Sequence, residues 1–293
     1  MRILLIGNTG QLGCELESSF ASLGEVFGFD FPVVDLAKAS SIRNIVREIK
    51  PELILNAAAY TNVDKAEIEP ELAFLINGTA PGILAEEARL INSALIHYST
   101  DYVFDGEKGS AYTESDLPNP INIYGKSKLA GEQAVQAVGG SNIILRTAWV
   151  YNTYRDNFVT KVLQWARHNE TIRVVNDQIS NPTWARLLAM TTSLMIAKGG
   201  ADIHTWLSAH QGIYHLAGNG YASRFDWAEE ILTLDLKKEE QIVKEIKTAR
   251  TSEFSTPAQR PLFSALNCGL FYETFKLTLP GWKKGLTLAM RNK

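Results

Sequence analysis

The sequence has few cysteines and no long apolar run. Its 293 residues include two cysteines, Cys14 and Cys268, and neither stands in a C-x-x-C pair. A disulfide framework is therefore excluded, and a reducing compartment is favoured. The apolar run at 3–6 is too short for a signal peptide, and no later stretch reaches the roughly 18 apolar residues that a membrane helix needs. We therefore predict a cytoplasmic protein with no membrane partner.

An excess of one charge is also missing. The 29 basic and 32 acidic side chains give a net charge of -3, so nothing drives binding to a phosphate backbone and no nucleic-acid partner is expected. The five histidines show no metal-ligand spacing, and no metal site is predicted. With 45% hydrophobic and 21% charged residues, the composition is that of a globular protein and excludes disorder.

Short apolar runs alternate with segments of helical periodicity in the first half of the chain. This alternation predicts an α/β fold, a doubly wound parallel sheet over residues 1–150. Residues 151–293 are expected to form mainly a smaller substrate-binding lobe, with segments near 171–216 returning to the main domain. The tail after residue 237 looks rich in loops. The predicted strands are 3–6, 26–29, 53–55, 94–96 and 143–145, and the predicted helices include 11–22, 80–90, 157–169 and 184–197.

A glycine-rich loop directly follows the first predicted strand and opens the first helix. Gly7, Gly10 and Gly13 permit a tight turn and let the backbone approach a pyrophosphate at the helix N-terminus. Asp30 ends the next strand, where a carboxylate accepts hydrogen bonds from the adenosine ribose and repels a 2′-phosphate, which favours NAD. Asp35 and Leu36 are predicted to line the adenine pocket. The first domain is thus predicted to bind a nicotinamide dinucleotide.

Tyr124 and Lys128 stand four positions apart, which places them on one face of a helix. An ammonium beside a phenol lowers the pKa of the tyrosine and makes it a usable acid or base. Thr100 ends the strand that begins near Ala94, at the edge of the sheet where ligands bind. A hydroxyl at that edge can hold a substrate carbonyl in line with Tyr124. These three residues are the predicted catalytic group.

The glycine loop, Thr100 and the Tyr-x-x-x-Lys pair resemble those of the extended short-chain dehydrogenase/reductases, which have a Rossmann-type fold. More specifically, the chain resembles the dTDP-4-dehydrorhamnose reductases. That resemblance rests on GQLG at 10–13, NAAAYTNVDKAE at 56–67, STDYVFDG at 99–106, RTAWVY at 146–151, NDQ at 176–178 and Arg260-Pro261. It implies reduction of the 4-keto group of dTDP-4-dehydro-L-rhamnose to dTDP-L-rhamnose, by hydride transfer from NADPH or NADH with Tyr124 as proton donor.

The resemblance also implies two sets of binding residues. The cofactor would be lined by Gly7, Gly10, Gln11, Leu12, Gly13, Asp30, Ala57, Ala58, Ala59, Tyr60, Tyr124 and Lys128. The sugar nucleotide would be lined by Val63, Thr100, Asp101, Tyr102, Tyr124, Trp149 and Arg260. Two alternatives stay open at this point: Trp149 could pack in the core, and Arg260 could form a surface ion pair instead of pairing with the substrate diphosphate.

Some members of the resembled family join two subunits through a divalent cation held by acidic side chains. Glu15 matches one of these positions, but Arg186 stands where a second carboxylate is expected, so we predict a monomer or homodimer without a metal. A 4,6-dehydratase is disfavoured because Tyr102, not glutamate, follows Asp101. The remaining alternatives are a reductase or epimerase for another nucleotide-linked 4-keto-deoxysugar and a non-catalytic nucleotide-binding regulatory subunit.

Overall fold

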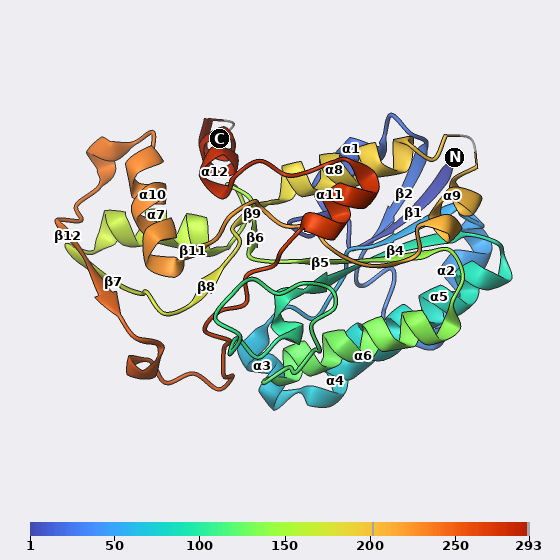
Figure 1. Ribbon diagram of the computed structural model, residues 1–293, viewed down its shortest axis with the longest axis horizontal. Helices are drawn as coiled ribbons and strands as arrows, with labels where there is room; N and C mark the ends of the chain where they lie inside the picture. Colours follow the sequence, from blue (N-terminus) through green and yellow to red (C-terminus); the bar gives the residue numbers. More distant parts are fainter. Residues whose placement is uncertain (201, 292–293) are drawn as a thin grey trace.

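The computed structural model describes residues 1–200 and 202–291, and its centre is a six-stranded parallel sheet (Figure 1). The strand order is β10-β5-β4-β3-β1-β2, and every pairing in this sheet is parallel. The predicted doubly wound, Rossmann-type sheet is therefore confirmed. The strands are β1 (Arg2–Ile6), β2 (Glu25–Phe29), β3 (Leu53–Asn56), β4 (Ala94–Thr100), β5 (Asn142–Thr147) and β10 (Gly212–His215).

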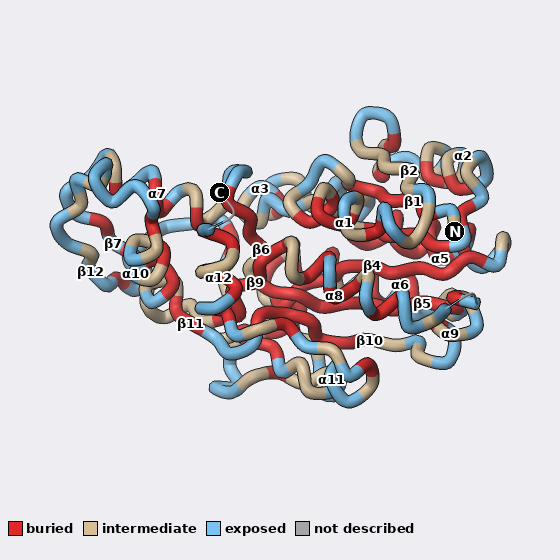
Figure 2. Tube along the Cα trace, turned by 90° about the horizontal axis from the view of Figure 1, so that it is seen from above, coloured by how far each residue is buried: buried red, intermediate tan, exposed pale blue. Residues whose placement is uncertain are grey.

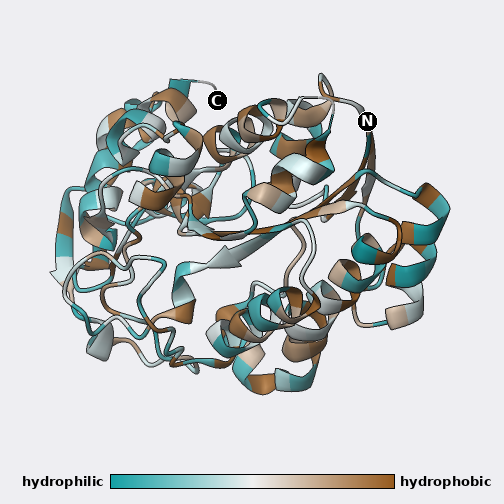
Figure 3. Ribbon diagram, turned by 45° about the vertical axis from the view of Figure 1, so that its right-hand side comes forward, coloured by the Kyte–Doolittle hydropathy of each residue, from teal (hydrophilic) through white to brown (hydrophobic). Residues whose placement is uncertain are grey.

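Helices cover both faces of the sheet because its strands are apolar on both sides. In β1, Ile3 and Leu5 join one apolar core while Leu4 and Ile6 join the other, as the two-residue period of a strand requires. One face is covered by α2 (Ala39–Ile49), α5 (Ala80–Leu90) and α6 (Ile123–Val138), and the other by α1 (Gly13–Phe20), α8 (Ala185–Ala197), α9 (Ile203–Ala209) and α11 (Gly269–Phe275). Most of these helices carry both hydrophobic and hydrophilic segments (Figure 3).

A smaller lobe extends from the carboxyl ends of the strands (Figures 1 and 2). Its own apolar core includes Val162, Ile172 and Trp227, and the indole of Trp149 packs against it. The lobe and its connections contain β6 (Val150–Tyr151), α7 (Phe158–His168), β7 (Thr171–Val175), β8 (Ile179–Ser180), β9 (Thr183–Trp184), β11 (Ala222–Ser223), α10 (Arg224–Leu234), β12 (Glu245–Ala249) and α12 (Trp282–Arg291).

Several segments depart from the expected boundaries. Helix α1 begins at Gly13 instead of residue 11, because the residues before it form the glycine turn. The tail contains β12, α11 and α12, and is more regular than its prolines suggested. Between residues 171 and 216, β10 joins the main sheet whereas β7 pairs with β12. Of the range 151–293, residues 201 and 292–293 lie outside the described part of the chain.

The remaining elements are short. They are α3 (Val63–Ile68), α4 (Pro70–Phe74), the π-helix η1 (Leu75–Thr79) and the 3-10 helices η2 (Asp101–Val103), η3 (Lys238–Glu240) and η4 (Thr251–Glu253). None of the helices that the structure describes is long and apolar enough to cross a membrane.

Candidate active site

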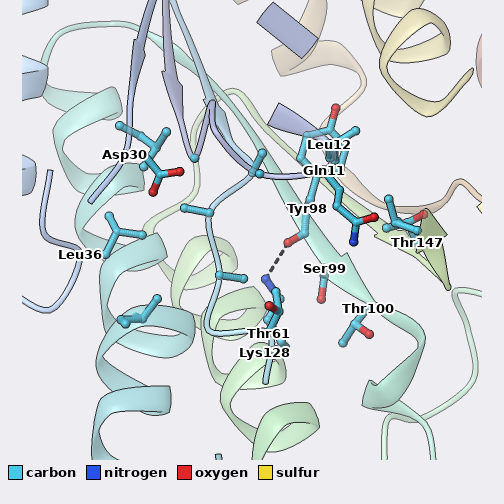
Figure 4. A pocket seen from close by; sticks show the side chains of 18 of the residues that line it. Gln11, Leu12, Asp30, Leu36, Thr61, Tyr98, Ser99, Thr100, Lys128 and Thr147 are labelled. Atoms are coloured by element: carbon cyan, nitrogen blue, oxygen red, sulfur yellow. Dashed lines mark hydrogen bonds between the residues drawn. The ribbon is translucent and has the colours of Figure 1, made fainter. Parts of the chain in front are cut away.

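A cavity of about 720 Å³ opens at the carboxyl ends of the sheet strands, where parallel α/β folds bind their ligands (Figure 4). Asp30 and Leu36 lie toward one side of the view, and Thr100 and Thr147 toward the other. The cavity brings together most of the residues that the sequence singled out. These are Gly7, Gly10, Gln11, Leu12, Asp30, Asp35, Leu36, Ala57, Ala58, Ala59, Thr100, Asp101, Tyr124, Lys128 and Trp149.

The glycine loop forms the wall of this cavity between β1 and α1. Gly7 has a φ of +88°, and a Cβ at this position would lie 2.7 Å from the backbone nitrogen of Ala58. A Cβ on Gly13 would lie 1.9 Å from the Gly7 carbonyl oxygen, so this glycine allows α1 to pack against the loop but does not line the cavity. The loop therefore has the close backbone packing of a pyrophosphate cradle.

Two backbone groups of the loop are available to a ligand. Within the described chain, the N–H groups of Gln11 and Leu12 donate to no protein acceptor, and they lie at the N-terminus of α1. The side-chain oxygen of Gln11 is also buried without a hydrogen-bond partner. Unpaired donors at a helix N-terminus favour an anion, so the residues present fit the diphosphate of a dinucleotide.

Two carboxylates lie at the far end of the cavity. Asp30 follows β2 directly and accepts a hydrogen bond from the Thr9 hydroxyl at 2.5 Å. Asp35 has its pKa lowered by Lys38, which lies 3.0 Å from it, and by the backbone N–H of Ala37. Both residues line the cavity, and their place at the adenosine end stays a prediction.

Thr100 and Tyr124 meet on the opposite side. Thr100 is the last residue of β4, and Tyr124 stands in the first turn of α6, whose N-cap Asn122 accepts from the Gly125 N–H at 2.7 Å. Burial raises the pKa of the Tyr124 phenol well above its ordinary value, and hydrogen bonding with Thr100 only partly offsets this shift in the pKa. Tyr124 therefore keeps its proton at neutral pH and can donate it.

Lys128 is oriented differently from the expectation. Its Nζ donates to the Tyr98 carbonyl at 2.7 Å, and burial lowers the pKa of this lysine to about 8 (Figure 4). The ammonium is thus held against strand β4, the strand that ends in Thr100. The prediction that Lys128 lowers the pKa of Tyr124 is wrong in this structure. Burial is the larger effect because the phenol and the ammonium lie in the same desolvated wall.

A buried polar network that was not predicted from the sequence supports these residues. Glu132 of α6 accepts from the Ser99 hydroxyl at 2.5 Å and from Arg146 of β5 at 2.6 and 2.9 Å. The next carboxylate, Asp101, accepts from Thr100 at 3.2 Å and from Ser180 and Ser264 at 2.8 and 2.5 Å. These contacts fix the end of β4 from three directions.

Trp149 connects the wall of the cavity to the apolar core of the small lobe. Trp149 has a φ of +40°, stacks on Trp227 at 5.4 Å between ring centroids, and has the Arg224 guanidinium 3.7 Å from its own ring centroid. It lines both the main cavity and a smaller one of about 290 Å³. Trp149 is therefore at once packed and exposed to the cavity. Arg224, whose pKa is lowered to about 10 by burial, was not predicted, because no motif contains it.

Four other predicted residues do not line the main cavity. The Tyr60 hydroxyl donates to Glu69 at 2.6 Å, and Val63 begins α3. The Tyr102 ring instead packs edge-on against the Tyr124 ring, with centroids 5.8 Å apart. Arg260 forms a two-pronged ion pair with Asp64 at 2.6 and 2.9 Å, so its guanidinium already has a partner.

Cavity-lining residues that sequence reasoning missed come mostly from positions next to predicted ones. They are Ile6, Phe31, Val34, Thr61, Ile76, Tyr98, Ser99, Thr147, Ala148, Val150, Arg155 and Asp156. Most of them lie within or beside the sequence motifs and could have been predicted from that position. The loop that carries Arg155 and Asp156 belongs to no motif, so these two could not.

Glu15, which matches a cation-binding position of some members of the resembled family, is paired with other side chains in this structure. Arg186 donates to Glu15 at 2.9 Å, and the Tyr154 hydroxyl donates to the same carboxylate at 3.2 Å. Among the residues that the structure describes, no group of three or more His, Cys, Asp or Glu side chains could hold a metal ion. Metal independence stays a prediction.

A doubly wound sheet with a glycine loop, with Thr100 at the end of β4 and with Tyr124 and Lys128 on the adjacent helix α6, defines a nicotinamide-dependent oxidoreductase of the short-chain dehydrogenase/reductase class. The family model described as "RmlD substrate binding domain" matches residues 1–293. The chain is 39% identical to a dTDP-4-dehydrorhamnose reductase of Escherichia coli K12, covering 98% of this chain and 96% of that protein. It is 37% identical to one of Burkholderia thailandensis, covering 100% and 99%.

A solved structure agrees with these relatives. The dTDP-4-dehydrorhamnose reductase of Bacillus anthracis, crystallised in complex with NADP, superposes with a TM-score of 0.88 at 34% identity and covers 100% of this chain and 99% of that one. The chain belongs to the dTDP-4-dehydrorhamnose reductase family.

Proposed function

We propose that this chain reduces the 4-keto group of dTDP-4-dehydro-L-rhamnose to give dTDP-L-rhamnose, with NADPH or NADH as the reductant. The observation that carries the proposal is the half-buried Tyr124 side chain, which lines the same cavity as Thr100, Lys128 and the glycine loop. The name shared by the relatives supplies the substrate, and the structure of the Bacillus anthracis relative with NADP supports the cofactor.

The residues divide the reaction between them. The bound nicotinamide cofactor supplies the hydride for the sugar C4, held by Gly7, Gly10 and the N-terminus of α1. Thr100 orients the carbonyl oxygen, and the Tyr124 O–H gives its proton to the oxygen as negative charge develops there. Lys128 would hold the ribose of the nicotinamide, and the tyrosinate left after the proton transfer recovers its proton from solvent.

We further propose a division of labour between the parts of the chain. Residues 1–150 would bind the cofactor, and residues 151–293 mainly the sugar nucleotide, with Val63, Asp101 and Tyr102 contributing from the first part. The second cavity, lined by Trp149, Arg224 and Trp227, supports this arrangement because it pairs aromatic faces with a cation next to the catalytic group. Arg260 would act on the substrate diphosphate only if its pairing with Asp64 opened or was shared.

The finer surroundings of the enzyme are also proposals. We expect a cytoplasmic enzyme, monomeric or homodimeric, whose two thiols stay reduced; both Cys14 and Cys268 are unpaired. Light scattering of the purified protein distinguishes the two oligomeric states.

The test follows the loss of reduced-nicotinamide absorbance with dTDP-4-dehydro-L-rhamnose, with NADPH and NADH in parallel. Oxidation that yields dTDP-L-rhamnose supports the proposal, and the ratio of rates gives the preferred cofactor. Absence of oxidation by protein that binds NADPH would contradict it and would favour another 4-keto-deoxysugar or a regulatory subunit.

A further inference from the structure

We infer that Arg155, on the loop between β6 and α7, binds the diphosphate of the nicotinamide cofactor. This inference rests on the proposed function, because it adds a residue to the cofactor site. Arg155 lines the main cavity together with the glycine loop. No motif or resemblance pointed to it.

The charge of the cavity wall provides the first argument. The described lining residues include four carboxylates but only two cations, Lys128 and Arg155. The Lys128 ammonium already donates to the Tyr98 carbonyl at 2.7 Å. The guanidinium of Arg155 forms no hydrogen bond or ion pair within the described chain, whereas its neighbour Asp156 pairs with Lys161 at 3.3 Å. Among the described lining residues, Arg155 is therefore the cation that is available to bind a dianionic group in this cavity.

The backbone of this residue is held firmly. Its N–H donates to Asn152 Oδ1 at 2.8 Å, and its carbonyl accepts from Asn157 Nδ2 at 2.8 Å and from Thr160 Oγ1 at 2.9 Å. Asn157 is also the N-cap of α7, so the loop is anchored to a helix of the small lobe. A fixed backbone lowers the entropy that an arginine loses when it binds an anion.

Tyr154 ties the same loop to the cofactor-binding helix. Its hydroxyl lies 2.8 Å from Cys14 Sγ and donates to Glu15 Oε1 at 3.2 Å, and both partners stand in the first turn of α1. Directly before this turn lie the unpaired N–H groups of Gln11 and Leu12. The loop thus brings Arg155 toward the end of α1 that is prepared for phosphate.

Two diphosphates could meet this guanidinium, one in the cofactor and one in the sugar nucleotide. The attachment of Tyr154 to α1 favours the cofactor, because the α1 N-terminus is the pyrophosphate end of the fold. Arginine suits this role because its planar guanidinium can donate two parallel hydrogen bonds to phosphate oxygens.

The experiment measures binding, without turnover, for Arg155→Gln, Arg155→Lys and the matched control Arg173→Gln. Arg173 is exposed on β7 and pairs with Glu253, far from the cavity. NADPH binding is followed by the quenching of tryptophan fluorescence, and dTDP binding by calorimetry. We expect Arg155→Gln to weaken NADPH binding about 10-fold, with a smaller loss for Arg155→Lys and unchanged dTDP binding. Arg173→Gln should leave both affinities unchanged.

A second variant tests the attachment of the loop. Tyr154→Phe keeps the ring and removes the hydroxyl, and we expect it to weaken NADPH binding about 2- to 3-fold. The wild-type affinity for NADPH should also fall more steeply with added salt than that of Arg155→Gln, since one ion pair is absent in the variant.

Three results would overturn the inference. Unchanged NADPH affinity in Arg155→Gln would remove the residue from the cofactor site. A loss confined to dTDP would assign it to the sugar nucleotide. An equal loss in Arg155→Lys and Arg155→Gln would show that charge is not the cause. If wild-type protein binds no NADPH at all, the proposed function itself fails, and this outcome is distinct from the other three.

Discussion

Burial, more than a neighbouring charge, decides the acid–base state of Tyr124. The sequence pattern predicted that Lys128 would make the phenol more acidic, but the ammonium is bound to the Tyr98 carbonyl and the phenol lies in a desolvated wall. A phenol with a raised pKa is a poor base at neutral pH but retains the proton that a ketone reduction consumes. Without ligands, the Tyr124 side chain is thus suited to donate a proton and not to accept one.

Replacing Tyr124 by phenylalanine should remove this proton and little volume. We expect turnover to fall about 10²- to 10⁴-fold, while NADPH still binds with nearly the wild-type affinity. Steady-state rates and a fluorescence titration of the same preparation check both halves of the expectation. Turnover within a factor of about three of wild type would remove Tyr124 from the role of proton donor.

Lys128 gives the reaction a pH dependence. Because burial lowers its pKa to about 8, the ammonium loses its proton as the pH rises through that value, and kcat/KM for NADPH should fall above about pH 8. Tyr124 cannot cause this limb, since its pKa is raised. A pH profile of kcat/KM at saturating sugar nucleotide measures it, and a flat profile up to pH 10 would contradict the assignment.

The same group affects stability with a defined sign. Between about pH 8 and the ordinary lysine pKa of 10.5, the unfolded chain binds more protons at this lysine than the folded chain does. Its contribution to the free energy of unfolding therefore increases with pH across this window and is constant below it.

A buried ion pair joins helix α6 to strand β5, and a hydrogen bond to the same carboxylate joins strand β4. Glu132 and Arg146 have side chains that are 1% and 2% exposed, and Glu132 also accepts from Ser99, the residue before Thr100. The pair therefore connects the helix of Tyr124 to the strand of Thr100. Exchange of either partner would disturb the distance between the two catalytic hydroxyls as well as the core.

Arg146→Met should be strongly destabilising because it leaves the Glu132 carboxylate buried without its cation. We expect a loss of about 3–5 kcal/mol in the free energy of unfolding, and a smaller loss in the double variant Arg146→Met/Glu132→Leu. Urea unfolding followed by circular dichroism measures both. Arg173→Met, which breaks an exposed ion pair, is the matched control and should change little. A single variant as stable as its control would show that the buried pair does not support the fold.

The two lobes complete the site together. Asp101 of the main domain is held by Ser180 and Ser264, which come from segments far along the chain. Trp149 lies between the two cavities, and β6 directly after it pairs with β9. Asp101 in turn accepts a hydrogen bond from Thr100, so contacts from the later part of the chain help to position the end of β4.

The hydrogen-bond partners of Glu15 lead to a prediction about metal dependence. Arg186 and Tyr154 already satisfy this carboxylate, so we expect no divalent cation to be needed there. Activity and elution volume should be the same in a chelator and in excess Mg²⁺. Loss of activity, or a change from dimer to monomer, on chelation would show that the cation is required.

The sequence by itself determined the alternating fold of the main domain and the residues at its strand ends. Gly7 and Gly13, Thr100, and the Tyr124–Lys128 pair act through local spacing, since one turn or one helix face places each of them. For the same reason the predicted strands match the sheet closely. Helices α11 and α12 in the tail after residue 237 were not predicted, although Trp282, Leu286 and Ala289 of α12 follow a helical period.

Only the tertiary structure decided which partners these residues meet. The sequence left open whether Lys128 would meet the phenol or the Tyr98 carbonyl, and in the structure it binds the carbonyl. It also left open whether Arg260 would be free for a diphosphate, and in the structure it pairs with Asp64. The same holds for Arg155, which enters the cavity because Tyr154 contacts α1 almost 140 positions earlier. Which partner a side chain binds depends on desolvation and on contacts between distant segments. Neither effect produces a periodic pattern or a fixed spacing that can be recognised in the sequence.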